Sequence, residues 1–365
     1  MSVENSPVKP SRSPSVVETL DDFENQDTLL KHVDISIVES EKRANGTLHV
    51  RDHYTVYLID LKVTNPEYKL VQSKISTIWR RYTEFEQIHD YLQVTYPHVV
   101  IPPLPEKRVL YAWRKSDTTD PEFVERRRAG LENFLLRVAS HPRLCFDDQF
   151  INFLQQEHGW RETITESGYI LQAENKLKSL SVSIRLKKPD PEIDSVKNYS
   201  KLLETNLGNF LYTRSKIMEK NYALCKLHAN YGKLFSEWSV IEKDMGDGLQ
   251  KAGHYFDSIA DSIDSVAEDE EQLADQLKEY LFYAGALQQL CANHEALQRA
   301  LELAHDTLNN REFTKKASIE IEHFQKQKDK DIHESLVGFI TLQVKAAKKN
   351  LQAWTQIREC LQNMP

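Results

Sequence analysis

The sequence predicts an α+β domain, with a three-stranded antiparallel sheet plus helices, followed by an all-α, elongated helical bundle. Two observations carry this prediction. Three β-type runs with alternating apolar residues lie between positions 32 and 82. From about residue 170 onward no plausible strand occurs, and apolar residues recur every three or four positions. A chain of 365 residues is long enough for about two or three domains.

The composition limits the classes of function. The net charge is −8, with 28% charged and 40% apolar residues, which is ordinary for a soluble protein with long charged helices and does not indicate a nucleic-acid binder. The four cysteines are far apart, so we expect reduced thiols in a cytoplasmic protein. No apolar run approaches the roughly 18 residues of a membrane span. We therefore expect any membrane to be met from outside.

The elements of the first domain follow in chain order. Residues 1–27 are rich in Ser, Pro and acids, and should form a disordered N-terminal tail. "HVDISIV", "YTVYLIDLKVT" and "KISTIWRRY" are typical of strands in an antiparallel meander. A helix should then end at Tyr96-Pro97, and the prolines of "VVIPPLPEKR" exclude both a helix and an inner strand. A second helix starts near Pro121, "FDDQFINFLQQ" adds a third, and the unit spans residues 28–158.

The second half, residues 192–365, carries apolar stripes at coiled-coil-like spacing, and "KDMGDG" is the strong break among them. A continuous helix from Gly248 to Leu308 would be about 90 Å long. A compact globule has no room for such a helix, so we expect an elongated bundle paired with a second chain. The residues expected in the dimer interface are Leu234, Trp238 and Leu281.

Nothing in the sequence indicates an enzyme. The GxSxG elbow, the GxxxxGK[ST] loop and the HExxH helix are all absent. The 13 histidines form no metal-ligand cluster. We therefore expect no catalytic residues, no cofactor and no metal.

A basic constellation is more informative. "WRRYTEFEQIHDYL" places Arg80 and Arg81 between a strand and a helix, where a soluble core has no evident use for them. Lys107 closes the proline loop, and residues 126–128 are three arginines in the second helix. Guanidinium groups bind phosphate oxygens in bidentate fashion. Spacing alone favours solvated faces over an anion site. Arg80 is not assigned to such a site, because side chains alternate along a strand.

"WRRYTEFEQIHDYL", "PPLPEKR" and "FVERRRAGLENFLLRVASHP", in this order and spacing, resemble a phox-homology (PX) domain. The resemblance implies a site for phosphatidylinositol 3-phosphate. It places the 3-phosphate arginine at Arg81 and the residue that stacks under the inositol ring at Tyr82. It places the lysine near the 1-phosphate at Lys107, and the arginine that bonds the ring hydroxyls at Arg127, although an arginine flanks Arg127 on each side.

"HANYGKLFSEWSVIEKDMGDGLQKAGH" and "DEEQLADQLKEYLFYAGALQ" resemble the BAR domain of sorting nexins, in particular the sorting nexin-4 branch. The resemblance implies a curved dimer with itself or another PX-BAR sorting nexin. It also implies transmembrane cargo and a peripheral place on early and recycling endosomes, in recycling, retrograde transport and autophagy. One feature departs from the family, in which helices two and three meet at a tip. Here "LAHDTLNNREFTKKASIEIEHF" has no visible loop and can even be read as one unbroken helix.

Two further segments could contact a membrane. The first, "VLYAW", is either a wedge that enters the bilayer or a loop folded back on the core. Its wedge residues would be Val109, Leu110, Tyr111 and Trp113. The second is a basic amphipathic helix within the linker 159–191, which either inserts at an anionic surface or docks its apolar face on a core. Its inserting residues would be Leu177, Leu180 and Ile184.

The charge of the bundle is uneven. Between Ala252 and Leu277 the sequence is acidic and contains no Lys or Arg, so we expect this face to lie away from anionic lipid.

Three functions compete. The leading interpretation is a non-enzymatic sorting adaptor that combines a weak lipid contact with a weak shape contact. A PX-recruited phospholipase or kinase would need an HxK motif, or HRD and DFG motifs, and these do not occur. The alternative is a cytoskeletal or scaffold coiled-coil protein brought to membranes by its PX domain. The break at Asp244–Gly248 and the aromatic-rich stripe favour a bundle over a two-stranded rod.

Overall fold

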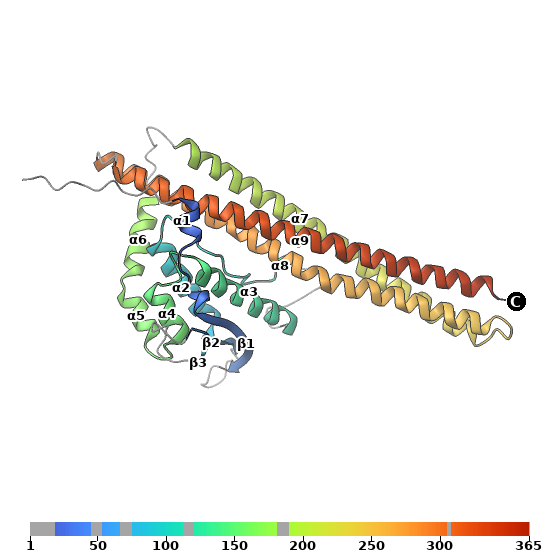
Figure 1. The fold of residues 1–365 in the computed structure, drawn as a ribbon. Coiled ribbons are helices and arrows are strands. Elements are labelled where there is room, and N and C mark those ends of the chain that lie inside the picture. The colour runs from blue at the N-terminus through green and yellow to red at the C-terminus, as the bar shows by residue number, and fades with distance from the viewer. Residues whose placement is uncertain are drawn as a thin grey trace, which may run out of the picture.

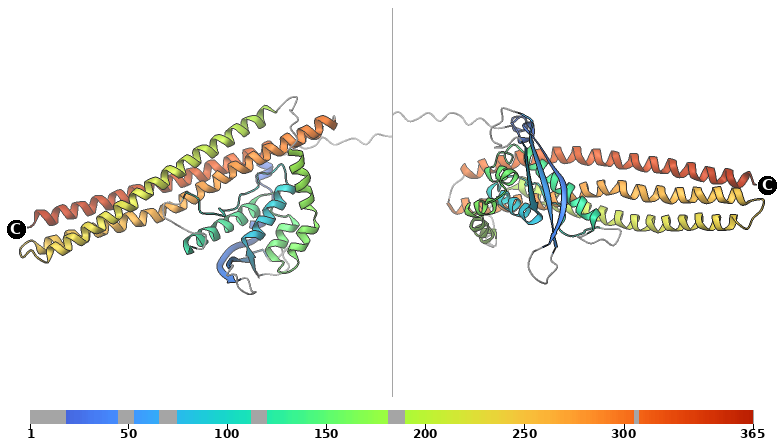
Figure 2. Two further views of the ribbon diagram at one scale, coloured as in Figure 1. Left: turned by 180° about the vertical axis from the view of Figure 1, so that it is seen from behind. Right: turned by 90° about the horizontal axis from the view of Figure 1, so that it is seen from below.

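A sheet domain lies beside one end of three long helices (Figure 1). The structure, a computed structural model, describes the ranges 19–44, 53–65, 75–111, 120–180, 190–304 and 308–364. The other half of the long helices projects beyond the sheet domain, and both views of Figure 2 show this projection. The predicted combination of an α+β domain and an elongated helical bundle is confirmed.

The sheet is an antiparallel meander in the order β1-β2-β3, as predicted. It consists of β1 (Val33–Ala44), β2 (His53–Val63) and β3 (Ile75–Arg81). Apolar residues at alternate positions, such as Ile35 and Ile37, turn to the buried face. A bulge after Ile37 shifts the register of β1 and leaves the Val38 side chain exposed.

Helices pack on the buried face of the sheet. These helices are α2 (Tyr82–Thr95), α3 (Pro121–Ser140), α4 (Asp148–Gln155) and α5 (Trp160–Glu166). At the start of α3 the Asp120 side chain accepts the N–H of Glu122, and Pro121 occupies the first turn. The core is rich in aromatic rings that meet edge to face, including Phe85, Phe134, Phe153 and Trp160. Trp160 shows that α5 belongs to this core, although the sequence analysis had put it in the linker.

The long helices are α7 (Pro191–Ser239), α8 (Gly246–Ala304) and α9 (Leu308–Gln362). The predicted break at "KDMGDG" is confirmed, but it lies slightly earlier: the turn that joins α7 and α8 spans residues 240–245, and Gly246 and Gly248 already belong to the first turn of α8. Reading the next junction as one unbroken helix was wrong. α8 and α9 pack along each other and run in opposite directions, so the chain reverses between them. Three packed helices also argue against a two-stranded rod.

Part of the expected disordered tail is ordered. α1 (Leu20–Glu24) begins with a capping box in which Thr19 and Asp22 exchange hydrogen bonds. Phe23 is fully buried and packs edge to face against His141 and His323, so α1 is held between the two domains. A short 3-10 turn, η1 (Leu29–Lys31), then leads into β1. The tail prediction failed here because one aromatic side chain supplies the anchor; residues 1–18 lie outside the described part of the chain.

The linker helix is α6 (Tyr169–Leu180). It runs beside α2 and reaches α8 (Figure 1). Tyr169 packs against Tyr91 of α2, whereas Ile170 and Leu171 are exposed. No helix in the described ranges is long and apolar enough to cross a membrane.

Buried ion pairs join the two domains. Arg137 of α3 contacts Glu279 of α8 at 3.0 Å and Asp331 of α9 at 2.5 Å. Glu320 of α9 is almost fully buried and lies 2.9 Å from His141 and 3.0 Å from Arg143. Burial alone would raise the pKa of Glu320, but the two basic neighbours outweigh it and lower the pKa below its ordinary value.

We predict that Glu320→Ala lowers the free energy of unfolding by about 3 kcal/mol, because it leaves two buried basic groups without their carboxylate. Urea denaturation followed by circular dichroism measures this. The charge of Glu320 stabilises the fold above the ordinary carboxyl pKa. That contribution is lost as the pH falls through the lowered pKa, so the gap between variant and wild type should narrow in acid.

The matched control is Glu312→Ala on the same helix, where the exposed pair with Lys316 contributes little. Equal denaturation midpoints for the wild type and Glu320→Ala would contradict the importance of the buried contact.

Candidate functional site

The two arginines at the junction of β3 and α2 have opposite roles. Arg80 is only 3% exposed, and its guanidinium donates hydrogen bonds to the carbonyl oxygens of Phe153 at 2.9 Å and Gln156 at 2.6 Å. Burial lowers the pKa of Arg80 to about 10, and Glu84 opposes this shift. The expectation that a soluble core has no use for Arg80 was wrong. The alternation argument that left it out of the site agrees with this placement.

Arg81 points away from the core. It is the N-cap of α2, and its backbone N–H donates to the Glu84 carboxylate at 2.8 Å. Its guanidinium carbon lies 3.5 Å from the centre of the Tyr54 ring, a cation–π contact. The side chain lines a surface hollow of about 420 Å³ together with Arg43 and Arg161. Glu84, Glu157 and Glu162 line the same hollow, so Arg81 is half-exposed among side chains of both charges.

Tyr82, at the start of α2, presents its ring to two cations. The Arg127 guanidinium carbon lies 5.0 Å from the ring centre, and the Lys107 ammonium lies 6.0 Å from it. The hydroxyl donates to the carbonyl oxygen of Pro105 at 2.7 Å, which ties the proline loop to α2. Burial raises the pKa of Tyr82, so the phenol stays neutral. Tyr82, Lys107 and Arg127 are thus brought together, whereas the side chain of the neighbouring Arg81 lies over Tyr54 and lines a different hollow.

The three arginines of α3 point in three directions, as successive positions on a helix must. Arg127 donates from Nη2 to the carbonyl oxygen of Lys107 at 2.9 Å. Arg126 turns to the bundle, and Arg128 turns to the sheet, where it donates to the carbonyl oxygen of Ile37. Of the three, Arg127 is the one beside Tyr82, which is the position that the PX resemblance implied.

Lys107 is exposed, and its ammonium forms an ion pair with Glu86 of α2 at 2.8 Å. Around the Tyr82 ring, an arginine and a lysine lie close to one acidic group. Such a set can bind a phosphorylated ring: the guanidinium offers paired donors, the lysine a point charge, and the tyrosine a flat face. No cluster that could hold a metal occurs in the described ranges.

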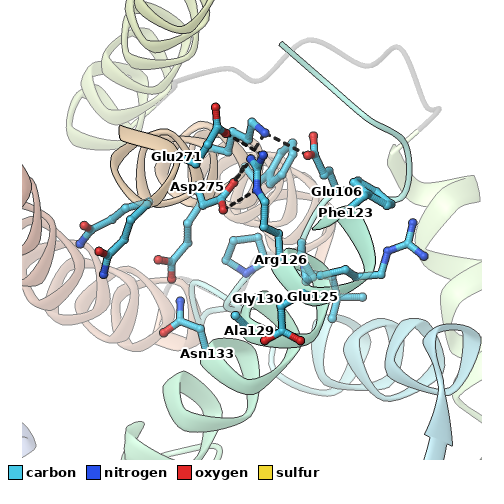
Figure 3. Close-up of a pocket in the computed structure, with 18 of the residues that line it drawn as sticks. Glu106, Phe123, Glu125, Arg126, Ala129, Gly130, Asn133, Glu271 and Asp275 are labelled. Atoms are coloured by element: carbon cyan, nitrogen blue, oxygen red, sulfur yellow. Dashed lines mark hydrogen bonds and ion pairs between the residues drawn. The ribbon is translucent and has the colours of Figure 1, made fainter. Parts of the chain in front are cut away.

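Behind this loop lies a cavity of about 520 Å³ between the proline loop, α3 and α8 (Figure 3). Arg126 crosses it and forms ion pairs with Glu271 at 2.6 Å and with Asp275. These carboxylates belong to the acidic stretch of α8. The sequence analysis expected that stretch to avoid lipid but missed its use as a docking surface for arginines. The absence of Lys and Arg from this acidic stretch was the signal that could have indicated a basic partner elsewhere in the chain.

The predicted membrane segments are described only in part. Val109 is half-buried and Leu110 is exposed, but Tyr111 packs against the α7–α8 core. The placement of Tyr111 favours the alternative in which this loop folds back on the protein. Trp113 and Ile184 lie outside the described residues. Leu177 and Leu180 lie in α6, whose backbone is described there although its side chains are not.

The residues expected at a dimer interface divide into two groups. Leu234 and Trp238 on α7 are 51% and 45% exposed. Leu281 is half-buried and packs inside this chain, against the cluster that contains Leu211 and Leu277. The free half of the bundle carries further exposed apolar side chains. Among them are Leu224, Leu227, Tyr231, Val344, Leu351 and Trp354.

The PX domain family matches residues 68–157. Sorting nexin-4 of Mus musculus and of Homo sapiens are each 41% identical to the chain over 398 residues, covering 92% of this chain and 88% of the relative. Sorting nexin-30 of Xenopus tropicalis is 24% identical over 332 residues, covering 85% of this chain and 73% of the relative.

Among solved structures, the cryo-EM structure of the SNX-BAR Mvp1 tetramer is similar, with a TM-score of 0.62 and 18% identity over 88% of this chain and 99% of that chain. This likeness shows the fold, and the sequence relatives show the family. The chain therefore belongs to the sorting nexin family and has a PX domain followed by a BAR-type helical bundle.

Proposed function

We propose that this chain is a non-enzymatic adaptor that binds phosphatidylinositol 3-phosphate on early and recycling endosomes. In this proposal its helical bundle dimerises and senses or induces curvature during endosomal recycling, retrograde transport and autophagy, with transmembrane proteins as cargo. The architecture of PX domain and BAR-type bundle is that of a membrane-trafficking adaptor. The proposal adds to this architecture the identity of the lipid, the membrane and the transport process.

The observation that carries the lipid assignment is the arrangement around Tyr82. Arg127 and Lys107 approach its ring, and Arg81 directly precedes Tyr82 in the chain, with its guanidinium over the Tyr54 ring. The ring hydroxyl and Arg127 both donate to backbone carbonyls of the proline loop, so Tyr82 and Arg127 are held in fixed positions relative to Lys107, which supports the proposal. Because Lys107 is exposed, a headgroup phosphate could replace Glu86 as its partner.

The dimer proposal rests on how the three long helices divide their apolar surface. α8 lies against both neighbours and buries residues along its length, such as Ile259 and Leu287. On the free half of the bundle, α7 and α9 expose large apolar side chains, among them Trp238 and Trp354. An exposed apolar surface of this kind marks an interaction site. A second PX-BAR chain, identical or related, would cover it.

A shortened α8–α9 arm is a further part of the proposal. The alignment with the sorting nexin-4 relatives extends over 398 positions, more than the 365 residues of the whole chain. The relatives therefore carry segments that face gaps in this chain. α8 ends at Ala304 and α9 begins at Leu308, so the connection between them is short. We propose that the missing length belongs to this arm.

Arg81→Ala should weaken binding to vesicles with phosphatidylinositol 3-phosphate by about 1.5–3 kcal/mol, the scale of a charge-assisted hydrogen bond. It should also release the protein from endosomes. Vesicle sedimentation measures the affinity. Arg80→Ala is the contrasting neighbour, because it should disturb the fold, seen by circular dichroism. Undiminished binding by Arg81→Ala would remove Arg81 from the site.

Replacing Leu234 and Trp238 by Glu should abolish dimerisation, because each carboxylate would have to be desolvated in an apolar interface. Light scattering coupled to size exclusion, alone and with a candidate PX-BAR partner, reports the mass. Lys233→Glu on the same turn is the matched control. A wild-type chain that stays monomeric with every partner would refute the dimer.

Replacing Leu177 and Leu180 by Glu tests the linker helix. If α6 inserts, the variant should still fold, dimerise and bind vesicles through Arg81, but it should no longer form tubules. Each carboxylate would cost roughly 2–3 kcal/mol in the hydrocarbon of the bilayer. Electron microscopy of vesicles gives the readout. Tubulation equal to that of wild type would exclude insertion. Loss of folding or dimerisation would mean that the apolar face is core.

A further inference from the structure

We propose that Lys278 of the helical bundle is a positioning residue for the headgroup site of the PX domain, which it holds through Glu106. The inference rests on the proposed lipid function and extends it. It assigns part of lipid recognition to a helix that is distant in sequence and outside the PX domain. The consequence is that the PX site and the bundle form one recognition unit.

The central group is the carboxylate of Glu106, and each of its two oxygens accepts a hydrogen bond. Oε1 accepts from the Lys278 ammonium at 2.9 Å, and Oε2 accepts from the backbone N–H of Leu110 at 2.8 Å. The two side chains are 7% and 10% exposed, so water competes weakly for this pair. Lys278 has one further carboxylate nearby, that of Asp275 at 3.6 Å. One oxygen of Glu106 thus faces the bundle and the other closes the loop.

The loop that Glu106 closes contains the lipid-binding lysine. Lys107 follows Glu106 directly and lies inside the turn that ends at Leu110. The carbonyls on either side of Glu106 are held from the lipid side, because Pro105 accepts from Tyr82 and Lys107 accepts from Arg127. Lys278 holds the loop from the opposite side. The position of the Lys107 side chain therefore depends on donors from both domains.

Two neighbouring contacts hold the same frame. Arg126, one residue before Arg127, forms ion pairs with Glu271 and Asp275 of α8 (Figure 3). Tyr111, at the far end of the loop, packs against the α7–α8 core with a backbone φ of 52°. This is the left-handed region, which residues other than glycine rarely adopt. The packing of the Tyr111 side chain must therefore hold the backbone in this conformation. α8 is thus attached to the headgroup loop on both sides of Lys107.

Removal of Lys278 has a defined physical effect. The Glu106 carboxylate would remain buried without its main cation, which is strongly unfavourable. Arg126 also lies within electrostatic reach of Glu106, but it is already paired with two carboxylates of α8. Glu106 can therefore regain a partner by turning toward solvent or toward Lys107. Either movement opens the turn to Leu110 and displaces Lys107 from the Tyr82 ring. Lipid affinity should fall even though no lipid-binding side chain has changed.

The experiment uses the full chain and compares phosphatidylcholine vesicles with and without phosphatidylinositol 3-phosphate. Lys278→Met should weaken binding to the lipid-containing vesicles roughly tenfold, the scale of losing one positioned charge contact. The soluble short-chain lipid, titrated by calorimetry, should show the same loss, which excludes an effect of bilayer docking. Lys62→Met is the matched control. It removes the same charge from a carboxylate, Asp60, that is about as buried as Glu106, but at the end of β2 away from the strand partner of Arg81, so the folded variant should bind like wild type.

A rescue separates positioning from a general structural role. Glu106→Gln combined with Lys278→Met removes both charges and leaves an amide oxygen that can accept from Leu110. This double variant should recover binding to within about threefold of wild type, because no buried charge is left unpaired. Lys278→Arg, which keeps the charge, should also retain affinity. Both remain informative if Lys278→Met alone fails to fold, as judged by circular dichroism.

The outcomes are distinguishable. If wild-type protein binds both vesicle types equally, the proposed lipid function is wrong. If wild type prefers the 3-phosphate lipid and Lys278→Met matches it within about twofold, the lipid function stands and the positioning role of Lys278 is wrong. If the folded double variant fails to regain affinity, the route through Glu106 is wrong.

Discussion

The relative placement of the two domains depends on desolvated charge pairs at their junction. Arg126 and Arg137 of α3 meet carboxylates of α8, and Glu320 of α9 meets His141 and Arg143. Desolvation makes such pairs a weak source of net stability, but leaving one partner alone is strongly unfavourable. The junction therefore selects one geometry, since any shift of α3 along the bundle would strand several buried charges at once.

This constraint gives the two ends of the bundle different tasks. At one end the bundle is covered by the PX domain, and Val100 of that domain even joins the bundle core with Tyr283 and Phe324. At the other end the apolar side chains of α7 and α9 remain exposed. The proposed lipid site and the proposed dimer surface are thus separated along one long body. Because α8 touches both regions, it is the element through which they are connected.

Much of the fold was predictable because it is encoded locally. Alternation predicted the three strands, Pro121 the start of α3, and "KDMGDG" the turn between α7 and α8. The contacts that lie far apart in sequence were not predictable. Arg80 reads as a surface arginine until Phe153 supplies its acceptor, and Glu106 and Lys278 are 172 positions apart. α1 was missed although Thr19 and Asp22 have the spacing of a capping box, because a Ser- and Pro-rich tail obscured that signal.

The ion pair between Lys107 and Glu86 makes binding of an anion at the proposed headgroup site an exchange of one anion for another. The lysine already has a counter-ion supplied by the protein, so a headgroup bound at the proposed site would have to exchange places with a carboxylate. Dissolved salt screens the incoming and the outgoing anion alike, and the two effects partly cancel. The lysine should therefore add little to the ionic-strength dependence of binding. The lysine should still discriminate against anions of low charge. Only a phosphate that carries more negative charge than the Glu86 carboxylate is attracted more strongly by the ammonium than Glu86 is.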